Sequence, residues 1–130
     1  MVLDTSAIIC ILLAERGNEL LVQRLSQSTI VVVGAATAVE TGIVLSARLN
    51  RDARPLLNGF LREAEAELIP FSREHYQIAV EAFLRYGKGR HPAALNFGDC
   101  LAYAVARVAE LPLLCTGKDF QKTDLETITN

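Results

Sequence analysis

The sequence lacks the features that indicate a zinc site, a membrane segment or a strongly basic surface. It has three cysteines and two histidines, but no Cys-x-x-Cys pair and no closely spaced histidines, so the ligand spacing of a zinc site is missing. The longest apolar run near the start, residues 7–14, is too short to cross a bilayer. The formal net charge of −2 provides no overall attraction for a polyanion. We therefore expect a cytoplasmic protein with buried, reduced cysteines and no membrane contact.

The length and composition are those of one folded domain. The chain has 130 residues, of which 51% are hydrophobic and 22% charged. A chain of this size can bury a core without disulfides. We expect a single domain over residues 1–130.

Short apolar segments alternate with segments of helical periodicity along the whole chain. Strands are expected at residues 1–4, 29–33, 68–71 and 111–116, with a further one at 126–128. Helices are expected at 7–14, 18–25, 35–49, 56–67, 73–86 and 100–108. The alternation predicts an α/β fold of three layers, with helices on both faces of a mostly parallel sheet of four to five strands. Ligands bind beyond the carboxyl ends of such strands, where Asp4 and the residues after Thr116 lie.

Three carboxylates stand alone in otherwise uncharged stretches. Asp4 is the only charged residue among residues 1–14, Glu40 the only one between Arg24 and Arg48, and Asp99 the only one between residues 90 and 107. A carboxylate in an apolar element is costly to desolvate unless a cation, a proton or hydrogen bonds compensate it. The three therefore suggest one shared cation.

Each carboxylate also has an ordinary structural interpretation. Asp4 and Asp99 could act at helix N-termini, the second with Asn96 as N-cap, and Glu40 could be a solvated face residue. Glu40 is the hardest to explain this way, because its helical neighbours at three and four residues' distance carry no charge. It needs a partner from another element.

Asp119 and Asp124 are two candidates for a fourth acidic residue, both in polar sequence of mixed charge. An all-oxygen cluster suits Mg²⁺ or Mn²⁺ rather than zinc. Such an ion held between carboxylates can activate water for attack on a phosphodiester, which is hydrolytic nuclease chemistry. The one basic segment, residues 85–91, precedes the Asp99 helix and is either a solvated loop or a phosphate contact.

The chain resembles the PIN-domain nucleases, and specifically the VapC-type toxins of bacterial toxin–antitoxin modules. The resemblance rests on segments 1–7, 38–40, 86–92, 95–100 and 113–120, in that order and spacing. It implies a PIN-like fold and an endoribonuclease that cleaves RNA, often tRNA or ribosomal RNA, with Mg²⁺ or Mn²⁺. It also implies a homodimer inhibited by a cognate antitoxin protein.

The same resemblance implies roles for individual residues. Asp4 and Asp99 would bind the metal, and Glu40 and Asp119 would do so directly or through water. Polar groups that support these ligands or face the substrate would be Ser6, Asn96 and Thr116. The residues expected to contact RNA are Arg85, Lys88, Arg90 and Lys118, the last standing where relatives often carry an acidic residue. Five aliphatic residues near the N-terminus are expected to lie mostly in the core, and some of them could form the groove for an antitoxin helix: Ile8, Ile11, Leu12, Leu21 and Leu25.

Two other functions remain open from the sequence. One is a PIN-like binding module that associates with RNA or protein without catalysis. The other is a hydrolase of small phosphate esters.

Overall fold

The computed structural model describes all residues from 1 to 130, and its centre is a five-stranded sheet. The strand order is β3-β2-β1-β4-β5 and every pairing is parallel. The prediction of a mostly parallel sheet of four to five strands is therefore confirmed. The strands are β1 (Val2–Leu3), β2 (Val32–Gly34), β3 (Glu67–Ile69), β4 (Leu113–Leu114) and β5 (Thr127–Ile128).

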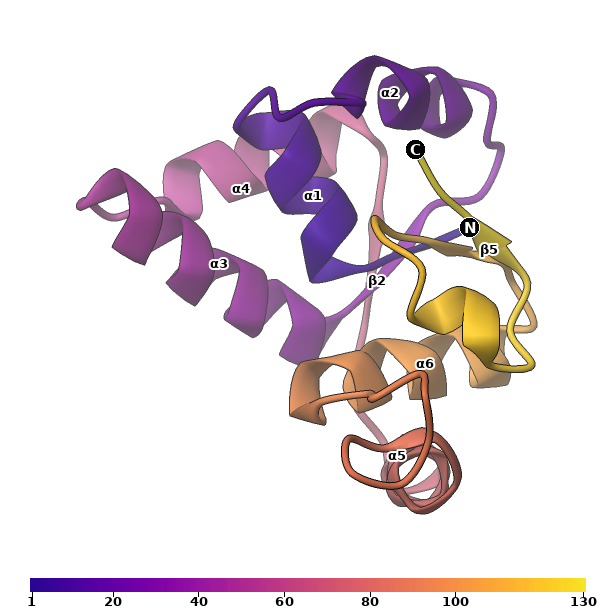
Figure 1. The fold of residues 1–130 in the computed structure, drawn as a ribbon. Coiled ribbons are helices and arrows are strands. Elements are labelled where there is room, and N and C mark those ends of the chain that lie inside the picture. The colour runs from indigo at the N-terminus through magenta and orange to yellow at the C-terminus, as the bar shows by residue number, and fades with distance from the viewer.

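Six α-helices cover the two faces of this sheet, as the three-layer prediction requires (Figure 1). Helices α1 to α4 lie on one side, and α5 and α6 lie on the other. None of them is both long and apolar enough to span a membrane. Their bounds are α1 (Thr5–Leu12), α2 (Asn18–Ser26), α3 (Ala35–Leu49), α4 (Arg54–Glu63), α5 (Arg73–Tyr86) and α6 (Phe97–Ala109), and a short 3₁₀ helix spans Phe120–Lys122.

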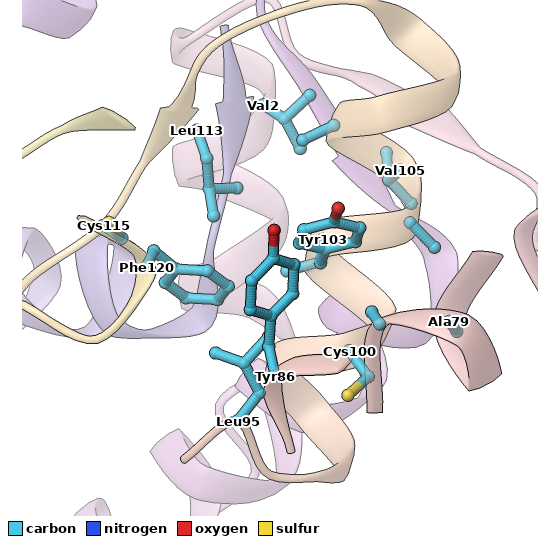
Figure 2. Packing of buried hydrophobic residues seen from close by; sticks show 14 of the residues in the cluster. Val2, Ala79, Tyr86, Leu95, Cys100, Tyr103, Val105, Leu113, Cys115 and Phe120 are labelled. Carbon is cyan, nitrogen blue, oxygen red and sulfur yellow. The ribbon is translucent and has the colours of Figure 1, made fainter. Parts of the chain in front are cut away.

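Two apolar clusters hold the layers together. The side chain of Val2 enters the cluster under α5 and α6, which includes Tyr86 and Tyr103 (Figure 2). The next residue, Leu3, enters the cluster under α1 to α4. Side chains alternate across a strand, so β1 is apolar throughout because both of its faces are buried. Cys10, Cys100 and Cys115 are buried free thiols, as predicted.

The helices α3 and α5 match their predicted bounds, whereas the region around β3 is displaced toward the N-terminus. α4 ends at Glu63 instead of residue 67, and the chain then turns through Glu65 with a φ of 49°. The backbone N–H of Glu67 donates to the carbonyl of Val31 at 2.9 Å, which starts the β2–β3 pairing. The strand expected at 68–71 therefore begins one residue and ends two residues earlier than predicted, because helix and strand compete for the same apolar segment.

The strand order places a crevice at the end of β1. From β1 the chain first adds β2 and β3 on one side, and later returns to add β4 and β5 on the other side. The direction of winding therefore reverses between β1 and β4, which is where open α/β sheets bind ligands. Asp4 follows β1 and Thr116 lies just beyond β4, so both lie at this reversal.

Candidate active site

Asp4 is the residue directly after β1 and the N-cap of α1. Its Oδ2 accepts hydrogen bonds from the backbone N–H of Ser6, at 2.9 Å, and from the Ser6 hydroxyl. The side chain is buried, and this burial raises the pKa of Asp4 although the hydrogen bonds from Ser6 act in the opposite direction. Asp4 therefore has the capping role that the sequence allowed. Its hydrogen-bond donors are neutral, however, and do not compensate its negative charge.

Glu40 projects from α3 toward the first turn of α6. A methyl group at residue 98 would collide with the Glu40 carboxylate, so Gly98 is what allows the two helices to place this carboxylate beside Asp99. Burial raises the pKa of Glu40, and the negative charge of Asp4 raises it further. The Thr5 side chain acts in the opposite direction, but Glu40 forms no ion pair, so the partner that the sequence required for its charge is not supplied by another side chain.

Asp99 lies in the first turn of α6 and forms a capping box with Asn96. Its Oδ2 accepts from the Asn96 backbone N–H at 2.9 Å, and its own backbone N–H donates to Asn96 Oδ1 at 2.9 Å. Burial raises the pKa of Asp99 to about 6 despite the Asn96 hydrogen bond, with further contributions from the charges of Asp4, Glu40 and Asp119. Like Asp4, it caps a helix and still carries an uncompensated charge.

These three carboxylates line one cavity of about 260 Å³ at the carboxyl end of β1. The polar groups expected to support them, Ser6, Asn96 and Thr116, line the same cavity. Ser6 connects its walls, because its hydroxyl donates to Asp4 Oδ2 and accepts from the Thr116 backbone N–H at 3.0 Å. One side chain therefore holds together the segments that follow β1 and β4.

The donor set fits a hard divalent cation, although the side chains as they stand do not form a closed metal cluster. No three acidic, histidine or cysteine side chains come close enough together to enclose an ion. Hydrogen bonds engage Oδ2 of both aspartates and leave each Oδ1 free. Free carboxylate oxygens from three elements are the ligands that Mg²⁺ and Mn²⁺ take.

The two candidates for the fourth acidic residue lie in different places. Asp119 is exposed, pairs with Lys122 at 3.3 Å, and contributes to the raised pKa of Asp99. Asp124 lies elsewhere and accepts a hydrogen bond from the Tyr103 hydroxyl at 2.6 Å. Asp119 does not line the cavity itself, but of the two it is the one whose charge reaches the site.

The four basic residues expected to contact RNA lie outside the acidic cavity. Arg85 pairs with Asp124 at 3.6 Å and stacks over the ring of Tyr86. Arg90 lies over the ring of Phe83, 5.5 Å from its centroid, and Lys88 and Lys118 are exposed. Their contact with RNA stays a prediction.

Comparisons with known proteins agree with this arrangement. The family model described as PIN domain matches residues 1–126. The chain is 44% identical to ribonuclease VapC36 of Mycobacterium tuberculosis over 127 residues, which are 97% of this chain and 91% of the relative. The chain belongs to the PIN-domain family. The level of identity also bears out the VapC-type resemblance of this PIN domain.

Solved structures show the same fold at low sequence identity. VapC20 of M. tuberculosis, described as a sarcin–ricin loop cleaving toxin, superimposes with a TM-score of 0.77 at 16% identity, covering 95% of both chains. A toxin–antitoxin complex from Klebsiella pneumoniae gives a TM-score of 0.71 at 18% identity, covering 98% of this chain and 95% of that one. At such low identities these two structures show only that this PIN domain has the same fold.

The sequence interpretation of this PIN domain missed two charged residues of the cavity, Arg48 and Glu15. Arg48 Nη1 and Glu15 Oε1 are 2.6 Å apart and both side chains line the acidic cavity. A signal was available, since Glu40, Val44 and Arg48 are spaced by four residues and share one face of α3. Glu15 follows α1 in a loop, and no sequence pattern marks it.

Proposed function

We propose that this PIN domain is a metal-dependent endoribonuclease that acts as the toxin of a toxin–antitoxin pair. The observation that carries the proposal is the cavity where Asp4, Glu40 and Asp99 meet with raised pKa values and with no cationic partner. The ribonuclease name of the 44% identical relative supports the choice of RNA as substrate.

In this function the chain's own residues bind and orient. Asp4 and Asp99 would hold Mg²⁺ or Mn²⁺, with Glu40 and Asp119 acting directly or through water. Such an ion lowers the pKa of a bound water and offsets charge on the leaving oxygen. Ser6 and Asn96 fix the orientation of the two aspartates through the hydrogen bonds at Oδ2. Fixed ligands reduce the entropy lost when substrate and ion assemble.

The RNA would approach as a single strand or a loop, whose backbone can bend into a pocket at the sheet end. The acidic cavity repels phosphates, so bound metal and nearby basic residues must reverse the local potential. The exposed Lys88 and Lys118 are candidates for this contact, and tRNA or ribosomal RNA is the proposed target class.

Replacing one cavity aspartate by asparagine tests the proposal. We expect Asp4→Asn and Asp99→Asn each to reduce RNA cleavage in Mg²⁺ or Mn²⁺ by about 100-fold or more, since each removes a charged ligand. Asp52→Asn is the matched control, because Asp52 pairs with Arg54 outside the cavity and should leave cleavage unchanged. Cleavage is measured by gel with and without EDTA, and sequencing of the RNA ends identifies the target.

The alternatives give different results in the same assay. Equal cleavage by wild type and both cavity variants contradicts the proposed site. Metal-dependent turnover of a small phosphate ester without RNA cleavage favours a phosphohydrolase. Retention of RNA without any cleavage favours a binding module.

Two apolar surfaces support the proposed protein partners. For the antitoxin helix, a cavity of about 470 Å³ between α1, α2 and α4 is lined by Ile11 and Leu25 of the predicted groove and also by Glu63 and Glu65. Ile8 and Leu21 belong instead to the core. For a second copy of the chain, a cavity of about 640 Å³ between α3, α5 and α6 is lined by hydrophobic residues with Glu40 as its only charge. Light scattering on the chain alone and on the chain co-expressed with its antitoxin measures both assemblies.

A further inference from the structure

Arg48 is the only lysine or arginine that lines the acidic cavity. It lies in the last turn of α3, two helical turns beyond Glu40 on the same face, or about 12 Å along the axis at 1.5 Å per residue. The Arg48 side chain therefore reaches the cavity from the C-terminal end of α3 and lines it together with Glu40.

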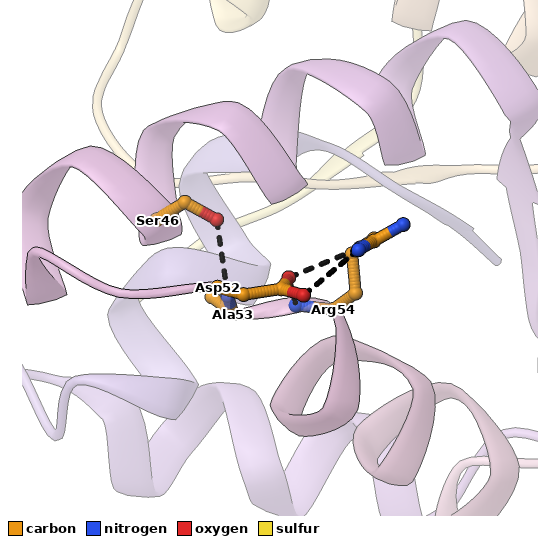
Figure 3. A network of polar contacts seen from close by, with 4 residues as sticks. All are labelled: Ser46, Asp52, Ala53 and Arg54. Atoms are coloured by element: carbon orange, nitrogen blue, oxygen red, sulfur yellow. Dashed lines mark hydrogen bonds and ion pairs between the residues drawn. The ribbon is translucent and has the colours of Figure 1, made fainter.

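The guanidinium of Arg48 is only partly engaged. Its Nη1 donates to Glu15 Oε1, while Nε and Nη2 make no hydrogen bond. Arg54 provides a contrast, because its Nε and Nη2 both bind the carboxylate of Asp52 as a fork (Figure 3). About half of the Arg48 side chain is exposed, at 52%. Arg48 thus keeps N–H donors without a hydrogen bond in a side chain that lines the cavity and is half exposed.

The positive charge of Arg48 does not neutralise the three carboxylates of the cavity. It forms no ion pair with Asp4, Glu40 or Asp99, and its one carboxylate partner is Glu15. A cation that a fold places beside an acidic cavity without neutralising it is available to an anion that enters from solvent. Arginine is suited to this because its planar fork binds phosphate through two N–H groups.

We propose that Arg48 binds a phosphate of the RNA backbone that flanks the bond to be cleaved, and that Glu15 holds the guanidinium in place when no RNA is bound. This inference rests on the proposed ribonuclease function. The incoming phosphate takes the free N–H donors and competes with Glu15 for the rest. Arg48 is then a substrate-binding residue, separate from the carboxylates that hold the metal.

Binding of RNA without metal tests this role apart from cleavage. The probe is a fluorescein-labelled, single-stranded oligoribonucleotide of mixed sequence, measured by anisotropy in EDTA over a range of salt concentrations. We expect Arg48→Gln to weaken binding about three- to tenfold and to reduce the slope of log K against log salt by about 0.7, the value for one phosphate contact on a single strand. Arg48→Lys should keep the wild-type slope, because the charge remains.

Two further variants separate phosphate binding from a structural role. Arg54→Gln also removes an arginine from an exposed ion pair, but outside the cavity, and should leave affinity and slope unchanged. Glu15→Gln removes the competing carboxylate and should tighten binding. The inference is overturned if Arg48→Gln has the slope of the wild type, or if Glu15→Gln weakens binding as much as Arg48→Gln does.

The outcome is independent of the test of the ribonuclease function. Metal-dependent cleavage that is lost in Asp4→Asn, together with an Arg48→Gln slope equal to that of the wild type, overturns the Arg48 contact alone. An Arg48-dependent slope in a chain that never cleaves RNA supports the contact and contradicts the ribonuclease function. Thermal unfolding of Arg48→Gln at the wild-type temperature shows that lost binding is not lost folding.

Discussion

The acidic cavity and the cluster around Asp124 shift the pKa of an aspartate in opposite directions. Asp124 accepts a hydrogen bond from Tyr103 and lies 3.6 Å from Arg85 and 3.8 Å from Arg107. Burial alone would raise its pKa, but these partners outweigh burial and lower it. Asp4 and Asp99 receive hydrogen bonds only from neutral groups, and their pKa values are raised.

The contrast shows that this fold can supply cations to an aspartate and does not do so at the end of β1. The Asp124 cluster joins α5 and α6 to the C-terminal segment, so its charges serve the fold. The charges of the cavity oppose folding, because buried carboxylates without a partner charge are unfavourable. Uncompensated charge that a fold retains in a cleft indicates a functional site.

The largest effect that would sharpen this contrast is expected from Gly98→Ala. The new methyl group must displace the flexible end of Glu40, while alanine suits a helix better than glycine by up to about 1 kcal/mol. We expect RNA cleavage to fall about 10- to 100-fold with unchanged or higher thermal stability, because one carboxylate leaves the site and the core stays intact. Steady-state cleavage and thermal unfolding measure the two effects.

Gly59→Ala is the matched control for this substitution. Gly59 also lies in a helix, α4, and a methyl group there meets nothing closer than Arg62, at 4.0 Å. It should gain stability without losing activity. If Gly98→Ala cleaves like the wild type while Glu40→Gln is inactive, the position of Glu40 against α6 is not what the chemistry needs.

A smaller effect is expected at the compensated aspartate. Asp124→Asn keeps the shape of the side chain but removes the charge that Arg85 and Arg107 share, and we expect it to cost about 1 to 2 kcal/mol of unfolding free energy. The acidic cavity does not include Asp124, so RNA cleavage by the folded variant should persist. Urea unfolding measures the loss of stability, and the gel assay measures the retained cleavage. If Asp124→Asn is inactive but as stable as the wild type, the distinction between the acidic cavity and the Asp124 cluster is wrong.

The sequence predicted the parts of this comparison that depend on local pattern. The isolation of Asp4, Glu40 and Asp99 in uncharged segments led to one cavity, and the periodicity of α3 and α5 gave their bounds. The choice between Asp119 and Asp124 stayed open because both lie in mixed-charge sequence. It depends on which helices pack nearby, which no local pattern contains.

Arg85 shows the same limit from the other side. It begins the basic segment 85–91 and its contact with RNA stays a prediction, but its ion pair with Asp124, made from the last turn of α5, has no signal in the sequence. Gly98 likewise has no signal in a single sequence, since its role is to leave space for a carboxylate from another helix. Contacts between side chains of different helices depend on how the helices pack. Such contacts are what distinguishes the acidic cavity from the cluster around Asp124.

The smallest effect is the dependence of stability on pH, and it should have opposite signs in the two regions. The pKa of Asp99 is about 6 in the folded protein against an ordinary 3.8, so the folded state binds a proton that the unfolded state does not between these values. Metal-free protein should therefore gain on the order of 1 kcal/mol as the pH falls from about 7 to about 5, after allowance for solvent screening. Asp124, whose pKa is lowered, contributes stability that is lost only as the pH falls below its ordinary value. Urea unfolding in EDTA at both pH values measures the gain. Asp99→Asn should reduce it by the contribution of Asp99, whereas Asp4 and Glu40, whose pKa values are also raised, keep theirs. A gain of equal size in Asp99→Asn would assign the effect to other groups and remove the uncompensated charge of Asp99 as its cause.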